Sequence, residues 1–110
     1  MSGFPSQVTT SAGATAPSVG AATIATGQFS NATGSATQIV AARAGASGTG
    51  RVSLTLYNSS LVNVFVGVTG VTSSTGLRIL PGGSLTLYTT AAVYGVPASG
   101  TGTLDYIETY

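Results

Sequence analysis

The run Ser-Leu-Thr-Leu-Tyr occurs twice in the chain, at residues 53–57 and again at residues 84–88. Because side chains alternate between the two faces of a strand, the leucines of each copy share one face and the Ser, Thr and Tyr side chains share the other. Such a pattern is what a half-buried strand of a two-layer sheet protein requires. Both copies are therefore predicted to be strands whose leucines point into a core.

The same alternation extends over most of the chain after residue 36, in short runs separated by clusters of Gly, Pro, Asn and Ser. Closely spaced runs of this kind are typical of an all-β domain, and no segment supports a helix. We predict a small antiparallel β-sandwich of about seven to eight strands, the eighth being an edge strand at residues 22–29. The other predicted strands cover residues 38–43, 51–57, 61–68, 77–80, 84–88, 93–96 and 103–110.

Two of the separating clusters have the composition of hairpin turns. One is Asn-Ser-Ser at residues 58–60, and the other is Leu-Pro-Gly-Gly-Ser at residues 80–84, where proline restricts φ and glycine permits positive φ. Each cluster is therefore predicted to join two strands that are antiparallel neighbours in one sheet.

The first 36 residues contain too few large apolar side chains to build a core of their own. These are Met1, Phe4, Val8, Val19, Ile24 and Phe29. We therefore divide the chain into an extended arm rich in Ser, Thr, Gly and Ala at residues 1–36 and a β-sandwich domain at residues 37–110. An arm of this composition gains order by lying on another surface or another subunit.

Charged residues make up 5% of the 110 residues, whereas an ordinary soluble domain has roughly 25%. The three Arg residues are scattered and form no basic stripe, so we expect no binding to nucleic acid. The N-terminal residues lack the positive and apolar regions of a signal peptide, and no apolar run approaches the length of a membrane span. We therefore expect a soluble protein that is used in the compartment where it is made.

The chain has no His, Cys or Lys, so the nucleophile and base pairs of common hydrolases cannot form. Its two carboxylates, Asp105 and Glu108, lie three positions apart on a predicted strand and point to opposite faces, where both are expected to be solvated. That placement provides neither an acid and base pair nor a metal site. The glycine-rich segment 44–51 lacks the Gly-Lys-Ser/Thr ending of a phosphate loop. We expect no enzymatic activity, no cofactor and no metal.

Aromatic side chains remain as candidates for recognition. Tyr57 and Tyr88 fall on the faces opposite their leucines, and Phe65 falls opposite its valines. These side chains are expected either to form an exposed patch or to pack in the second layer or under the arm. The candidate interaction residues are Phe4, Pro5, Phe29, Tyr57, Phe65 and Tyr88.

Residues 37–110 contain the stretches QIV, LTLYN, VFVGVTGVTSSTG, LPGGSLTL and AVYGV. With these stretches the chain resembles a module of small structural proteins of tailed bacteriophages. The resemblance implies a virion protein without enzymatic activity that decorates capsids or belongs to tail and fibre parts. It carries over no site residues, because the matching stretches are strands and turns. The absence of a second globular domain after Tyr110 favours a stand-alone decoration subunit.

Two functions are therefore expected from the sequence. The first is a capsid decoration or cement subunit of the virion, assembled in the host cytoplasm, that binds the major capsid protein and its own copies as a homo-oligomer. A charge-poor surface suits this role, because it packs against neighbours without burying unpaired ions. The alternative is a tail or fibre module that binds host-surface glycan by stacking sugars on its tyrosines. Aromatics in an open groove beside Asn or Gln would favour glycan binding, and aromatics sealed in a subunit interface would favour the structural role.

Overall fold

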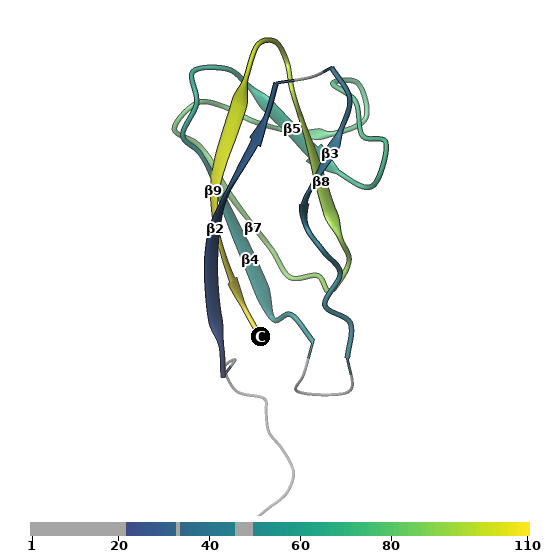
Figure 1. The fold of residues 1–110 in the computed structure, drawn as a ribbon, viewed down its shortest axis with the longest axis vertical. Coiled ribbons are helices and arrows are strands. Elements are labelled where there is room, and N and C mark those ends of the chain that lie inside the picture. Colours follow the sequence, from purple (N-terminus) through teal and green to yellow (C-terminus); the bar gives the residue numbers. More distant parts are fainter. Residues whose placement is uncertain (1–21, 33, 46–49) are drawn as a thin grey trace, which may run out of the picture.

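The computed structural model describes residues 22–32, 34–45 and 50–110, which form two four-stranded antiparallel sheets packed face to face (Figure 1). The all-β sandwich predicted from the sequence is confirmed, and the described residues contain no helix. The first sheet has the order β2 (Ile24–Asn31), β9 (Gly102–Thr109), β4 (Ser53–Asn58) and β7 (Ser84–Leu87). The second sheet has the order β3 (Thr37–Val40), β8 (Val93–Pro97), β5 (Val64–Gly67) and β6 (Leu77–Ile79).

The strands pair in a nested order along the sequence, the first described strand with the last, the second with the next to last, and so on toward the middle. Strand β2 pairs with β9, β3 with β8, β4 with β7, and β5 with β6. Successive pairs alternate between the two sheets, so every described connection except that between β5 and β6 passes from one sheet to the other. This nested order is the double Greek key of a jelly roll. The topology defines the fold and leaves the function to be argued from particular residues.

The core lies between the sheets and consists of the inward residues of each alternating strand. Leu54 and Leu56 of β4 and Leu104 of β9 are fully buried from the first sheet, and Val64 and Val66 of β5 are buried from the second. The leucines of the second Ser-Leu-Thr-Leu-Tyr run are partly buried and pack against the same cluster. The predicted inward and outward faces of these strands are therefore confirmed.

Both hairpin predictions are wrong, because the turns join strands of different sheets. Strand β4 lies in the first sheet and β5 in the second, while β6 lies in the second sheet and β7 in the first. The segment after β6 does turn tightly: Gly82 has a φ of 76°, and the Gly83 amide donates to the Leu80 carbonyl over 2.8 Å. Turn residues predict a change of chain direction, but which sheet the next strand enters depends on tertiary contacts.

Those contacts centre on Asn58, the last residue of β4, which is fully buried. Its amide donates to the Gly83 carbonyl over 2.9 Å, and its carbonyl accepts from the Gly82 amide over 2.8 Å. Its side-chain Nδ2 donates to the carbonyls of Val62 and Ile79, each over 2.8 Å. Asn58 thus ties together the two connections that pass between the sheets at this end of the sandwich.

The predicted boundary between arm and sandwich also lies too late in the sequence. Strand β2 pairs with β9 from Ile24 to Asn31, and both Phe29 and Asn31 are buried. The edge strand predicted at residues 22–29 is therefore present, and it belongs to the sandwich although its composition is that of the arm. Eight backbone pairs with β9 and the buried side chain of Phe29 hold strand β2 in the sandwich. Amino-acid composition does not reveal such backbone pairing between strands. The remainder of the arm predicted for residues 1–36, namely residues 1–21, lies outside the described residues.

Candidate interaction surface

The outer face of the first sheet is rich in hydroxyl groups, and we call it the hydroxyl face. Along β2, β4, β7 and β9 the outward residues are exposed or half-buried and alternate with the inward residues. The pairing places residues of all four strands in rows, for example Gln28 beside Asp105, Asp105 beside Tyr57, and Tyr57 beside Ser84. The hydroxyl face consists of Ile24, Thr26, Gln28, Ser30, Ser53, Thr55, Tyr57, Ser84, Thr86, Thr103, Asp105, Ile107 and Thr109.

Several polar groups of the hydroxyl face bond to one another across the strands. The Thr55 and Thr86 hydroxyl oxygens lie 3.0 Å apart, and those of Ser53 and Thr109 lie 2.7 Å apart. The Gln28 amide nitrogen donates to the Asp105 carboxylate over 2.9 Å. Because these groups already have partners, covering them with another surface leaves fewer polar atoms unsatisfied.

The predicted aromatic residues do not form one patch. Tyr57 lies on the hydroxyl face with 45% of its surface exposed, and Tyr88, which follows β7, is 81% exposed. Tyr57 lies beside Ser84, and Tyr88 is four positions farther along, which corresponds to roughly 13 Å of strand. Phe65 is half-buried in β5 of the other sheet, beside Arg78 and Val96.

Two of the remaining candidate residues, Phe4 and Pro5, lie outside the described residues. Phe29 is buried in the core cluster with Leu104 and Val93, so it contributes to the sandwich and not to an exposed surface.

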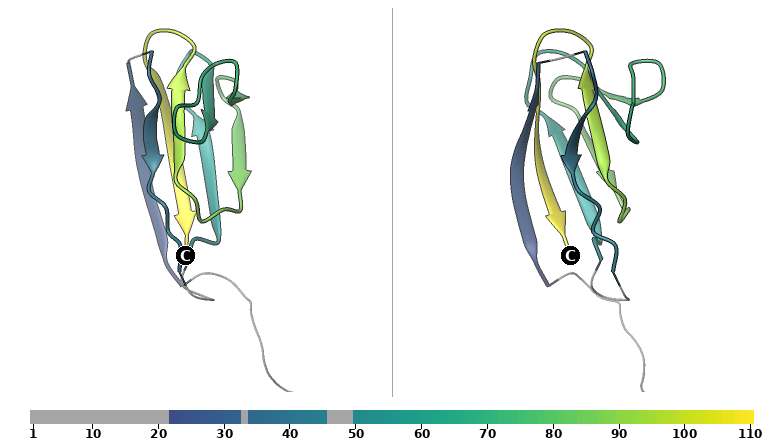
Figure 2. Two further views of the ribbon diagram at one scale, coloured as in Figure 1. Left: turned by 90° about the vertical axis from the view of Figure 1, so that its right-hand side faces the viewer. Right: turned by 45° about the vertical axis from the view of Figure 1, so that its right-hand side comes forward.

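The outer face of the second sheet is partly covered by the chain itself. The segment between β5 and β6 lies over this sheet, in front of it in the left view of Figure 2. Its Val71 is buried, and a Cβ added at Gly67 would lie 3.0 Å from Val71 Cγ2. The hydroxyl face is therefore the more open of the two sheet faces.

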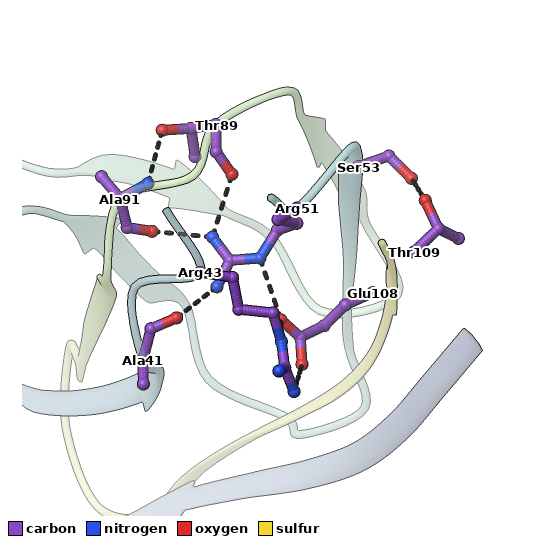
Figure 3. A network of polar contacts seen from close by, with 8 residues as sticks. All are labelled: Ala41, Arg43, Arg51, Ser53, Thr89, Ala91, Glu108 and Thr109. Carbon is purple, nitrogen blue, oxygen red and sulfur yellow. Dashed lines mark hydrogen bonds and ion pairs between the residues drawn. The ribbon is translucent and has the colours of Figure 1, made fainter. Parts of the chain in front are cut away.

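A cluster of charged side chains lies at the other end of β4 from Asn58, because Arg51 precedes this strand and Asn58 ends it. Figure 3 shows the contacts of this cluster. The side chains of Arg51 and Glu108 are 0% and 5% exposed, and Arg51 Nε donates to Glu108 Oε1 over 2.9 Å. The remaining Arg51 donors bond to backbone carbonyls of Thr89 and Ala91, at 2.9 and 2.7 Å, and of Ala41. One guanidinium thus joins the connections before β4 and before β8 to strand β9.

Arg43 completes this charge cluster from its outer side. Its Nε and Nη2 donate to the two Glu108 oxygens over 3.1 and 3.2 Å, and its guanidinium lies 3.8 Å from the centre of the Tyr110 ring. Burial raises the pKa of Glu108, but the hydrogen bonds and positive charges of the two arginines outweigh burial and hold the pKa below its ordinary value of 4.5. Glu108 is therefore an anion at neutral pH, and both of its oxygens accept hydrogen bonds from arginine, which suits a structural tie.

The expectation that Glu108 is solvated is wrong, because its side chain is 5% exposed. Leu104 and Glu108 are four positions apart on β9 and so share its inward face. The spacing that places Glu108 on the same face as Leu104 was visible in the sequence. A buried carboxylate at such an inward position requires a cationic partner. What the sequence did not show is that Arg43 and Arg51 supply it.

An apolar cleft opens along the edge of the sandwich where β6 and β7 end their sheets. Its volume is about 200 Å³, and almost all of its lining is hydrocarbon. Leu77 on one rim is 57% exposed although it is a large apolar residue. The cleft is lined chiefly by Val66, Leu77, Leu85, Leu87, Ala92 and Val93.

Other kinds of site have less support in the described part of the chain. Residues 22–32, 34–45 and 50–110 contain no group of three or more side chains placed to hold a metal ion. They also contain no helix long and apolar enough to cross a membrane.

Comparison of the chain with models of known protein families, with curated proteins and with solved structures gives no match. The features of the described residues that bear on function are therefore the hydroxyl face, the apolar cleft and the placement of the charges.

Proposed function

We propose that this protein is a non-enzymatic structural component of a bacteriophage virion, most specifically a decoration subunit that binds the major capsid protein and its own copies. The proposal joins the resemblance of residues 37–110 to phage structural modules with the surface chemistry of the sandwich. The jelly roll is compatible with it, since viral capsid domains use this architecture, as lectin domains do. Fold alone carries no functional conclusion, so the surface must supply the argument.

The observation that carries the proposal is the near absence of free ions from the surface. The sequence has three Arg, one Asp and one Glu, and every one of them lies among the described residues. Three of these five residues belong to the charge cluster, namely Arg43, Arg51 and Glu108. The other two, Arg78 and Asp105, lie outside the cluster. Removing one partner of a buried ion pair costs about 3–5 kcal/mol, and a surface with few ions avoids such a loss when a neighbour covers it.

The hydroxyl face is the surface that we assign to the contact with the particle. It is uninterrupted across four strands, its hydroxyls are partly paired with one another, and Asp105 accepts a hydrogen bond from Gln28. Ile107 lies in its middle, beside Thr26 and Thr55, and is 39% exposed. An apolar residue at the centre of a mainly polar face is the usual composition of a protein interface.

A charge placed at the centre of this face tests the proposal. Ile107→Lys would bury an unpaired ammonium group in the contact, so its occupancy on purified particles should fall at least roughly tenfold, as a loss of about 1.4 kcal/mol or more implies. Ser73→Lys adds the same charge in the exposed segment over the second sheet and serves as the control. Copies per particle are measured by quantitative mass spectrometry, and the melting temperature of each variant shows that it remains folded. Equal occupancy of both variants, or absence of the wild-type protein from particles, would contradict the proposal.

The alternative, a tail or fibre module that binds glycan, has one observation in its favour. Tyr57 is exposed beside Asp105, which is held by Gln28, so an aromatic face, a carboxylate and an amide lie together on the hydroxyl face. This combination suits a neutral sugar. If glycan binding is the function, Tyr57→Ala should abolish retention on host polysaccharide, whereas Tyr88→Ala, roughly 13 Å of strand away, should leave it unchanged. Unchanged retention of the Tyr57→Ala protein would exclude this role for the face.

A further inference from the structure

We propose that the apolar cleft between β6 and β7 receives the N-terminal segment of a neighbouring copy, residues 1–21, with the Phe4 ring seated in the cleft. The inference builds on the proposed function, because it requires copies that lie side by side.

The cleft and the segment match in size and in polarity. A cavity of about 150 Å³ lined by aliphatic side chains can hold a benzene molecule, and this cleft measures about 200 Å³. Phe4 supplies the one aromatic ring in residues 1–21, and the segment has no charged side chain. Entry of the segment therefore buries apolar surface on both sides and leaves no ion unpaired.

The backbone around the cleft offers a second means of binding. Strands β6 and β7 end their sheets, so each has one edge that no other described strand pairs with. An extended peptide can bind such an edge by adding to it as a strand while its side chains enter adjacent pockets. Pro5 favours an extended backbone at Phe4, and an edge strand tolerates a proline because one side of it needs no ladder hydrogen bond.

Donor and acceptor lie on opposite edges of the sandwich, an arrangement that allows contact between neighbouring copies. The segment joins the sandwich at β2, which is the edge strand of the first sheet opposite to β7. Its own cleft lies three strand spacings away, about 14 Å, and around the edge of the sandwich. A copy placed beside β2 can present its β6 and β7 edge directly, and 20 residues can span up to about 66 Å. Donor and acceptor on opposite edges produce a head-to-tail contact, which extends into closed rings or open filaments of copies.

Cysteine cross-linking tests this proposal, because the chain has no cysteine of its own. Ser6→Cys places a thiol close to Phe4 while keeping the ring, and Ala92→Cys places one in the lining of the cleft. The two single variants, carrying different tags, are mixed at roughly millimolar concentration, the local value expected for adjacent tethered copies. A short thiol-specific cross-linker then forms a mixed dimer only if the segment of one molecule reaches the cleft of another.

We expect the mixed dimer with Ala92→Cys and little with Ser73→Cys, because Ser73 lies in the segment over the outer face of the second sheet and does not line the cleft. Adding Phe4→Ala to the Ser6→Cys protein should lower the yield roughly tenfold or more, as the loss of one buried phenyl group predicts. Thr10→Ala in the same protein is the matched control and should have no such effect. Equal yields from Ala92→Cys and Ser73→Cys, no dependence on Phe4, or a cross-link formed only within the doubly substituted Ser6→Cys and Ala92→Cys chain would overturn the proposal.

The same cross-linking on purified particles separates this inference from the proposed function. A Phe4-dependent mixed dimer in solution together with absence from particles would support the cleft as a receptor and refute the virion role. High occupancy on particles without the cross-link, there or in solution, would refute the docked segment and leave the virion role standing.

Discussion

Replacing Asn58 by Asp would exchange one side-chain nitrogen for oxygen at the point where two connections between the sheets meet. Asn58 is fully buried, and its Nδ2 donates to the Val62 and Ile79 carbonyls over 2.8 Å each. Its Oδ1 accepts from the amide and the hydroxyl of Ser60 over 2.9 and 2.6 Å. The substitution keeps the shape and the acceptor, and it removes both donated bonds.

The expected cost follows from the two carbonyls that accept from Asn58 Nδ2. The Ile79 carbonyl loses its side-chain donor, whereas the Val62 carbonyl can still accept from the Ser60 hydroxyl over 3.2 Å. Because one unsatisfied buried group costs about 1–3 kcal/mol, Asn58→Asp should lower the free energy of unfolding by at least that amount at pH 7. A small domain has only about 5–15 kcal/mol of stability in total. Burial without a cation raises the pKa of a carboxyl group, and the protonated form can donate one bond. The variant should therefore be less destabilised, relative to wild type, at pH 4 than at pH 7.

Asn63→Asp is the matched control, because it makes the same chemical change in the same connection at a half-buried position. We expect a loss within about 0.5 kcal/mol for it, as for an ordinary surface substitution. Urea unfolding followed by circular dichroism at both pH values measures the differences. If Asn58→Asp and Asn63→Asp proved equally stable at pH 7, the assignment of Asn58 as the tie between the connections would be wrong.

The charge cluster supports two further predictions. Because the pKa of Glu108 is lower in the folded chain than its ordinary 4.5, its contribution to stability should be complete above about pH 4.5 and should decline as the pH falls through the folded pKa. Urea unfolding midpoints at pH 7, 4.5 and 3 should show this decline. A Glu108→Gln protein whose stability declines as much as that of the wild type would refute the assignment. Arg51→Lys should lower the free energy of unfolding by about 2–4 kcal/mol, because an ammonium group cannot satisfy Glu108 and three separate carbonyls. Arg43→Lys, at the exposed side of the cluster, should lower it much less. Thermal unfolding compares the two variants, and a similar loss of stability in both would contradict this division of roles.

Much of the candidate surface was predictable from the sequence, because strand alternation decides which side chains face outward. Thr55 and Tyr57 face out because Leu54 and Leu56 face in, and the same argument applies to Ser84 and the residues of β7. The grouping of the aromatics was not predictable. Tyr57 and Phe65 are eight positions apart in sequence, yet they lie on different sheets.

The sequence by itself determined the all-β class, the inward and outward phase of the strands, and the scarcity of charge. These properties depend on local geometry, the period of two along a strand, and composition, so neighbouring residues suffice to define them. Only the tertiary structure decided that the turns after β4 and β6 pass between sheets, that β2 belongs to the sandwich, and that Arg51 meets Glu108. Each of these depends on hydrogen bonds between residues more than 20 positions apart, and the choice among such partners is made by the packing of the whole chain.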